Sequence, residues 1–115
     1  MNLKDVVRNV VVDTRKLTEY ALNPDNPVGA DKALIFQIHL GFTKDNYKYL
    51  LEQIQAKAMS SEATLQRTDQ YGNHYRVDME VIGIEGQRET VRMGWVVEPD
   101  SDTARLTTLY VRRRK

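Results

Sequence analysis

The chain has 115 residues, a length that suits one domain able to bury a core without crosslinks. Its 41% hydrophobic and 29% charged residues are ordinary for a globular protein, and its net charge of +1 does not by itself imply a polyanionic partner. The lack of cysteine excludes disulfides, thiolate metal sites and a cysteine nucleophile. Because there is no secretion signal and no apolar run of membrane-spanning length, we expect a cytoplasmic protein with no membrane partner.

The predicted helical half runs from about residue 13 to 59 and follows an extended lead-in. The valines between residues 6 and 12 are β-branched, and such side chains favour strands over helices. Asp13 or Thr14 can cap a short helix over Arg15–Leu22. This helix ends at Asn23, because the residue before a proline is driven out of the α conformation.

Two longer helices are predicted next. The second helix runs from about Ala30 to Leu40, and Gly41 is suited to end it in a left-handed conformation. Thr43 is the expected cap of a third helix that runs to about residue 58 or 59. The apolar stripe of the second helix is formed by Leu34, Ile35 and Ile38 and widened by Ala33 and Phe36. In the third helix, the residues expected to face inward are Tyr47, Leu50, Leu51, Ile54 and Ala58.

After residue 61 the hydrophobic period changes from that of a helix to that of a strand. Four strands are predicted, over about 64–68, 74–82, 88–97 and 105–112, joined by short turns. The last strand is apolar on both faces, with Leu106 and Tyr110 on one and Leu109 and Val111 on the other. We therefore expect this strand to be central or covered, without knowing which of its faces is the core.

These elements predict an α+β fold in which N-terminal helices pack on one face of a four-stranded, mostly antiparallel sheet. Short hairpin connections favour antiparallel neighbours, and helices segregated from strands favour α+β over α/β. We expect a single domain over residues 1–115, with a helical half at about 13–59 and a sheet half at about 63–112. Residues 112–115 are expected to form a solvated basic tail.

A search for enzyme signatures is largely negative. The chain has no glycine-rich phosphate loop, paired-histidine metal helix or serine elbow, and we expect no metal and no cofactor. His39 lies late in the second predicted helix, where a cation suits the helix C-terminus, so a structural role is expected. His74 opens a strand on its polar face. It is either an inert surface residue or a general acid or base, because an imidazole exchanges protons near neutral pH.

Lys32 falls in the first turn of the second predicted helix, where its charge opposes the helix dipole at a cost of about 0.3–1 kcal/mol. In one interpretation the neighbouring Asp31 offsets this cost. In the other, the ammonium group and the free backbone N–H groups converge on an anion such as phosphate. The stretch from Asn23 to Gly29, rich in proline and turn formers, would then place the lysine.

Two arginines, Arg76 and Arg92, are predicted on the same face of neighbouring strands, near His74 and Thr90. Such a group suits stabilisation of a pentavalent phosphate during RNA cleavage, in which the 2′-hydroxyl of the substrate is the nucleophile. The competing explanation is a set of cross-strand ion pairs worth under about 1 kcal/mol each, formed with Asp78, Glu80 and Glu89.

Several motifs carry a resemblance to a known family. They are Lys16-Leu17-Thr18-x-Tyr20-x-Leu22-Asn23-Pro24-x-x-Pro27-x-Gly29-x-x-Lys32-Ala33, Leu40-Gly41-Phe42, Asp69-Gln70-Tyr71-Gly72-x-x-Tyr75-x-Val77-Asp78, Thr90-Val91-Arg92-x-x-Trp95 and Arg105-Leu106-x-Thr108-x-Tyr110. From about residue 10 to 111 the chain resembles a family of small, largely uncharacterised bacterial proteins with a domain of unknown function. Similar domains occur as C-terminal toxin modules of polymorphic toxins and as stand-alone proteins encoded beside a small partner.

The resemblance implies a toxin-like ribonuclease with helices on one face of a sheet, as in the barnase and colicin-nuclease group. The family commonly has histidine where this chain has Asn26, which makes His74 the candidate base. The expected catalytic residues are Lys32, His74, Arg92 and Tyr110, and the expected substrate-binding residues are Asn26, Arg76, Arg105 and Thr108.

Two functions are therefore expected. The first is a toxin-like domain that cleaves RNA without a metal ion and pairs with a small antitoxin or immunity-like protein. The second is a non-catalytic protein–protein interaction module that binds its partner through an open sheet face or edge. RNA turnover by the purified protein separates the two.

Overall fold

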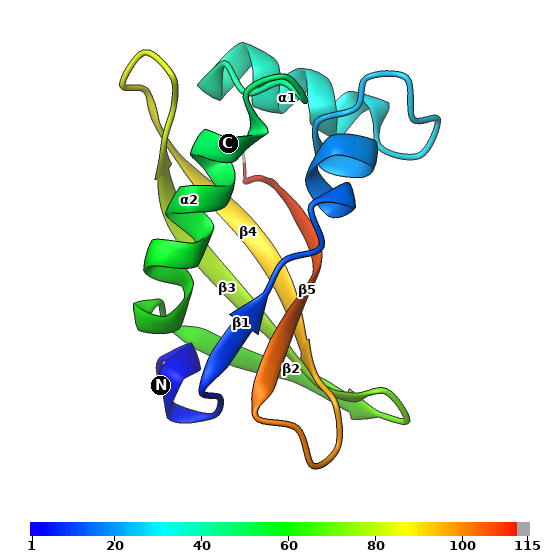
Figure 1. Ribbon diagram of the computed structural model, residues 1–115, viewed down its shortest axis with the longest axis vertical. Coiled ribbons are helices and arrows are strands. Elements are labelled where there is room, and N and C mark those ends of the chain that lie inside the picture. Colours follow the sequence, from blue (N-terminus) through cyan, green and yellow to red (C-terminus); the bar gives the residue numbers. More distant parts are fainter. Residues whose placement is uncertain (113–115) are drawn as a thin grey trace.

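The computed structural model describes residues 1–112 and has a mixed α+β architecture built on one five-stranded sheet (Figure 1). The strands are β1 (Asn9–Val11), β2 (Ala63–Asp69), β3 (Gly72–Ile82), β4 (Arg88–Val97) and β5 (Thr103–Val111). The helices are α1 (Ala30–Leu40), α2 (Tyr47–Lys57), the π-helical turn η2 (Lys16–Ala21) and the 3₁₀ turns η1 (Leu3–Asp5) and η3 (Ala58–Ser60).

The strand order in the sheet is β1-β5-β4-β3-β2. Strands β2 to β5 pair antiparallel, as predicted, whereas β1 pairs parallel to β5 through Asn9↔Thr103 and Val11↔Arg105. The prediction of four strands was therefore wrong by one. The valines of the lead-in favoured an extended strand, but its place in the sheet was missed because its partner lies at the other end of the chain.

Helix α1 has the predicted bounds, and Gly41 follows it in the left-handed conformation, with a φ of 74°. The predicted apolar stripe was wrong in part, because Ile38 is 72% exposed and Leu34 is 46% exposed, while Ala33 and Phe36, which only widened the stripe, are buried. Apolar residues occupy most positions of this helix, so periodicity alone could not choose between two stripes. The side chains that do face inward are Ala33, Phe36 and Leu40.

Helix α2 begins four residues after the predicted cap. Asn46, not Thr43, precedes it, and the amide of Asn46 closes the loop that follows α1. Its Nδ2 donates to the Gly41 carbonyl at 3.0 Å, and its Oδ1 accepts from the Thr43 N–H at 2.8 Å. From there α2 runs in front of β3 and β4 and buries Leu50 and Ile54, as predicted (Figure 1).

Strand β5 contains a bulge that explains its two apolar faces. Gly94 of β4 pairs with Thr108, but the next residue, Trp95, pairs with Leu106, so Thr107 is an extra residue. An extra residue shifts the alternation of side chains by one position. Leu106 and Leu109 therefore both face the core, although they differ in parity.

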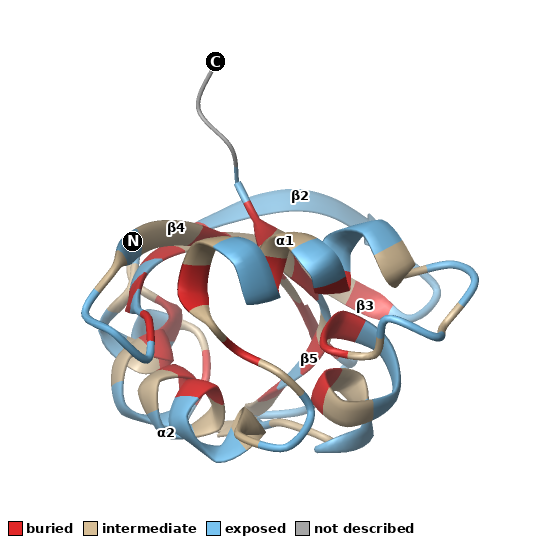
Figure 2. Ribbon diagram, turned by 90° about the horizontal axis from the view of Figure 1, so that it is seen from above, coloured by how far each residue is buried: buried red, intermediate tan, exposed pale blue. Residues whose placement is uncertain are grey.

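The core lies between one face of the sheet and the helices, where the buried residues gather (Figure 2). Its largest fully buried side chains are Trp95, Phe36 and Phe42. The opposite face of β3 and β4 carries the polar side chains of the alternating pattern, and β2 is exposed along almost its whole length. Within residues 1–112, no helix has the length and apolar character needed to cross a membrane.

Candidate functional site

The sheet face that points away from the helices contains a depression of about 380 Å³. We call it the sheet-face depression. The polar residues that line it are Gln66, Arg67, His74, Arg76, Arg92, Thr107, Thr108 and Tyr110. Five of the eight residues predicted for the site meet here, namely His74, Arg76, Arg92, Thr108 and Tyr110.

Strand register explains why these residues meet. Arg76, Gly94 and Thr108 lie side by side on β3, β4 and β5, and Arg92 and Tyr110 form part of the next row. Neighbouring strands are about 4.8 Å apart, so side chains in one row are in reach of one ligand. Gly94 leaves the floor of the depression open, because a Cβ there would lie 2.9 Å from Thr108 Oγ1 and 3.0 Å from Thr107 Oγ1.

Arg92 is held in place by Asp78. Its Nε and Nη2 donate to the two carboxylate oxygens at 2.8 and 3.0 Å, and Arg112 Nη1 donates to the same carboxylate at 3.2 Å. The Arg92 hydrogen bond lowers the pKa of Asp78 and raises that of Arg92, with Tyr110 adding to the second effect. The cross-strand ion pair expected as the competing explanation is therefore present. A guanidinium group has five N–H donors, and two of those of Arg92 bond to Asp78.

Arg76 differs from Arg92 in its partners. Among residues 1–112, no carboxylate lies within ion-pair distance of Arg76, although its charge contributes to the lowered pKa of Asp78. Its side chain is only partly exposed and lines the depression beside Gly94. Arg76 is therefore the cation of the depression best able to accept an external anion.

His74 forms a pair with Asp69. Its Nε2 lies 2.9 Å from Asp69 Oδ1, and its side chain is 17% exposed. The hydrogen bond from His74 is the main cause of the lowered pKa of Asp69, to which the Tyr71 N–H and Arg67 also donate. A carboxylate bonded to one ring nitrogen fixes the tautomer and leaves the other nitrogen to act as a base. The structure thus supplies His74 with an orienting partner that sequence analysis did not identify.

Lys32 reaches the sheet from the first turn of α1. Its Nζ lies 4.9 Å from the centre of the Tyr110 ring, although the lysine itself is exposed. Tyr110 is the register partner of Arg92. Lys32 therefore stands at the rim of the depression rather than on its floor.

Two predicted residues take no part in the depression. Asn26 is used within its own loop, where its Nδ2 donates to the Glu19 carbonyl at 2.9 Å and its Oδ1 accepts from the Val28 N–H at 2.9 Å. Arg105 lies in the row of His74 but two strands away from it, does not line the depression, and pairs with Glu98 at 3.0 Å. Sequence analysis missed Gly94, Thr107 and Asp69. Gly94 leaves space on the floor, Thr107 is the extra residue of the bulge, and Asp69 orients His74. None of these roles has a sequence motif.

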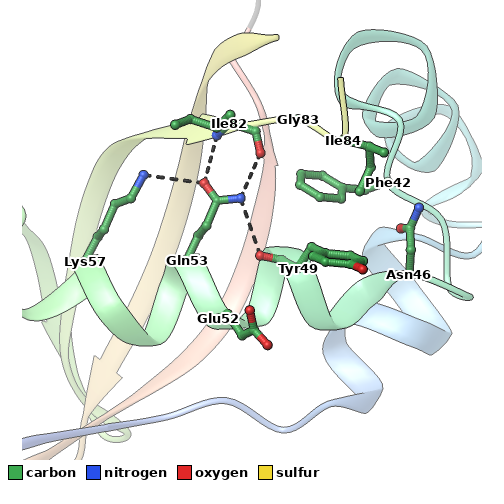
Figure 3. A pocket seen from close by; sticks show the side chains of 9 residues that line it. All are labelled: Phe42, Asn46, Tyr49, Glu52, Gln53, Lys57, Ile82, Gly83 and Ile84. Carbon is green, nitrogen blue, oxygen red and sulfur yellow. Dashed lines mark hydrogen bonds between the residues drawn. The ribbon is translucent and has the colours of Figure 1, made fainter. Parts of the chain in front are cut away.

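A larger hollow of about 530 Å³ lies between α2 and the β3–β4 hairpin (Figure 3). Its polar side chains bond to the unpaired edge of β3. Gln53 Nε2 donates to the Ile82 carbonyl and Gln53 Oε1 accepts from the Ile82 N–H, both at 2.8 Å, and Lys57 Nζ donates to the Glu80 carbonyl at 3.1 Å. The polar side chains of this hollow therefore satisfy backbone groups at the edge of the sheet. In the described part of the chain, no three histidine or acidic residues are grouped as metal ligands would be.

The family model of a domain of unknown function, DUF6883, matches residues 2–113. The chain belongs to this family. No curated protein and no solved structure gives a significant match.

Proposed function

We propose that this member of the DUF6883 family is a ribonuclease that cleaves RNA in the sheet-face depression without a metal ion. One observation carries the proposal: a histidine oriented by a carboxylate and two arginines line one hollow, whose floor is a glycine. Sequence parity had placed His74, Arg76 and Arg92 on one face, and the register adds Thr108 and Tyr110 from β5.

The depression suits a transesterification. The free ring nitrogen of His74 takes the proton of the substrate 2′-hydroxyl, the O2′–P bond forms, and the P–O5′ bond breaks. Arg76 and the remaining N–H groups of Arg92 stabilise the charge that develops on the phosphate oxygens. The Tyr110 hydroxyl protonates the leaving 5′-oxygen. Since the substrate supplies the nucleophile, the reaction needs neither a metal ion nor a covalent enzyme intermediate.

The charge of the depression agrees with an anionic substrate. Three arginines line it, and none of the lining residues within 1–112 is acidic. Asp69 and Asp78 bond to His74, Arg67 and Arg92 from its margin, which orients these side chains, while Arg76 has no such partner. The same proposal includes what the family resemblance implies, namely a toxin-like module with a small antitoxin-like partner that covers this face.

The test is digestion of total RNA by the purified protein in the presence of EDTA. We expect cleavage to products with 2′,3′-cyclic phosphate ends, and a loss of at least tenfold in rate for Arg76→Ala and His74→Gln. Arg88→Ala is the matched control, because Arg88 is an exposed strand arginine paired with Glu80 away from the depression. RNA that stays intact at high protein concentration, with and without divalent ions, would refute the proposal.

A protein-interaction module is the second candidate, and the apolar outer face of α1 favours it. Leu34 and Ile38 are one helical turn apart and both are exposed. Under this function the protein forms a stable complex that Ile38→Lys abolishes, and RNA is not turned over.

A further inference from the structure

A smaller hollow, of about 300 Å³, adjoins the sheet-face depression at the edge of the sheet. We call it the edge pocket. Thr107 and Thr108 line both hollows. The bulge explains this position, because it places two successive residues of β5 beside Gly94. A chain-like ligand lying in the depression can therefore continue over the two threonines into the edge pocket.

The edge pocket combines an aromatic ring with two cations. Tyr20 of η2 is 51% exposed, and Lys16 Nζ lies 5.6 Å from the centre of its ring. Lys32 also lines the pocket, and none of the lining residues of the described chain is acidic. Ala21, Val28 and Leu109 make the rest of the wall apolar. An apolar wall with an exposed ring suits a planar group. The ammonium groups of the two lysines suit an anion attached to that planar group.

We infer that the edge pocket binds the nucleotide next to the one cleaved, with its base stacked on Tyr20 and its phosphate near Lys16 and Lys32. The inference rests on the proposed function for the reaction, and it adds the substrate class: single-stranded RNA. Bases in a duplex are stacked on each other and cannot lie against a protein ring, whereas unpaired bases stack on exposed aromatic residues.

The lysine cations also predict how binding responds to salt. Each phosphate neutralised on a single strand adds about 0.7 to the slope of log affinity against log salt concentration. Lys16 contacts no carboxylate within ion-pair distance among residues 1–112, so its charge is available to a phosphate. Removal of the Lys16 charge should lower the slope of log affinity against log salt concentration. Removal of the Tyr20 ring should weaken binding and leave this slope unchanged.

The experiment measures binding of a fluorescently labelled five-nucleotide DNA strand, which lacks the 2′-hydroxyl and cannot be cleaved. Fluorescence anisotropy at several salt concentrations gives the affinity and the slope. We expect Tyr20→Leu to weaken binding about tenfold, Tyr20→Trp to retain it, and Lys16→Met to lower the slope by about 0.7. Tyr49→Leu and Lys48→Met are matched controls, because both residues are exposed on α2 and lie outside both hollows.

The outcomes separate the inference from the proposed function. If the wild type cleaves RNA but Tyr20→Leu and Lys16→Met bind and cleave as it does, the edge pocket is not a nucleotide site and the ribonuclease proposal stands. If the wild type binds the strand through Tyr20 but leaves RNA intact, the site stands and the reaction is refuted. Binding of a duplex of the same sequence, or of a mononucleotide, as tight as that of the strand would overturn the inference.

Discussion

The ammonium group of Lys32 lies 4.9 Å from the centre of the Tyr110 ring, and this contact ties the first turn of α1 to the outer face of β5. A cation over an exposed ring is worth about 0.5–1 kcal/mol. That gain is similar to the cost of placing a positive charge at a helix N-terminus, about 0.3–1 kcal/mol. The two effects oppose each other, so the lysine is held at the depression at little net cost in stability.

Lys32→Ala should therefore separate stability from function. We expect the free energy of unfolding in urea to change by less than about 1 kcal/mol, because the lost ring contact and the relieved dipole repulsion offset each other. RNA cleavage should fall at least tenfold. Lys48→Ala, on the exposed side of α2, controls for the loss of one surface charge. A destabilisation of 2 kcal/mol or more, as an order of magnitude, would show a structural role instead.

Gly94→Ala should fill the floor of the sheet-face depression. The new Cβ would come within 3.0 Å of two threonine hydroxyl oxygens, and overpacking of this kind costs about 1–3 kcal/mol. Thermal unfolding should show the loss, and Thr108→Ala in the same chain should restore part of it by removing one of the close atoms. If Gly94→Ala keeps the wild-type stability and RNA cleavage, the depression is not shaped by this glycine.

Stability should depend on Asp78 in acid. Because the Arg92 hydrogen bond lowers the pKa of Asp78 below its ordinary value of 3.8, the unfolded chain binds the proton more tightly than the folded chain. The contribution of the pair is thus present above about pH 4 and is lost as the pH falls through the lowered value. Asp13, with a pKa of about 2 beside Arg15, acts in the same direction.

The measurement compares urea unfolding of the wild type and Asp78→Asn between pH 2 and 7. We expect the variant to be about 1 kcal/mol less stable at pH 7, a small value because the pair is partly exposed. The two curves should converge in acid, since protonated Asp78 no longer binds Arg92 as an ion. A constant difference down to pH 2 would contradict the lowered pKa.

Gln53→Ala should expose the edge of β3. The amide of Gln53 bonds both backbone groups of Ile82 and stands where a neighbouring strand would. Loss of two such hydrogen bonds costs about 1–3 kcal/mol, and unpaired strand edges promote association between molecules. Size-exclusion chromatography should detect larger species for Gln53→Ala and none for Gln55→Ala, an exposed position of the same helix.

Local signals in the sequence predicted those parts of the fold that depend on neighbouring residues. Gly41 ended α1 as expected, and the alternation in β4 gave its bounds and its core face, because both signals act over a few positions. The parallel pairing of β1 with β5 could not be predicted, since it joins residues more than ninety positions apart. The position of Asn46, rather than Thr43, before α2 depends on its hydrogen bond back to the Gly41 carbonyl.

The part of the candidate site that could be predicted is the part that depends only on the alternation of side chains along a strand. Arg76 and Arg92 share a face because Arg76 pairs with Gly94, which is two residues from Arg92 on β4, and His74 follows from the same alternation. Thr108 and Tyr110 join them only because of the bulge at Thr107, which no motif marks. The contact between Lys32 and Tyr110, and the loop bonds that occupy Asn26, depend on packing between distant segments.

The bulge also decides which side chains of β5 reach the outer face of the sheet. Because Thr107 is the extra residue, its deletion would restore a regular ladder in which the side chains before and after it keep their faces. If β5 instead kept Thr107 and paired without a bulge, with Ala104 and Leu106 in their places, Leu109 and Val111 would turn to solvent, and Thr108 and Tyr110 would turn into the core. The pairing of β5 with β4, and not the composition of β5 alone, thus decides whether the sheet displays hydroxyl groups beside its arginines or hides them.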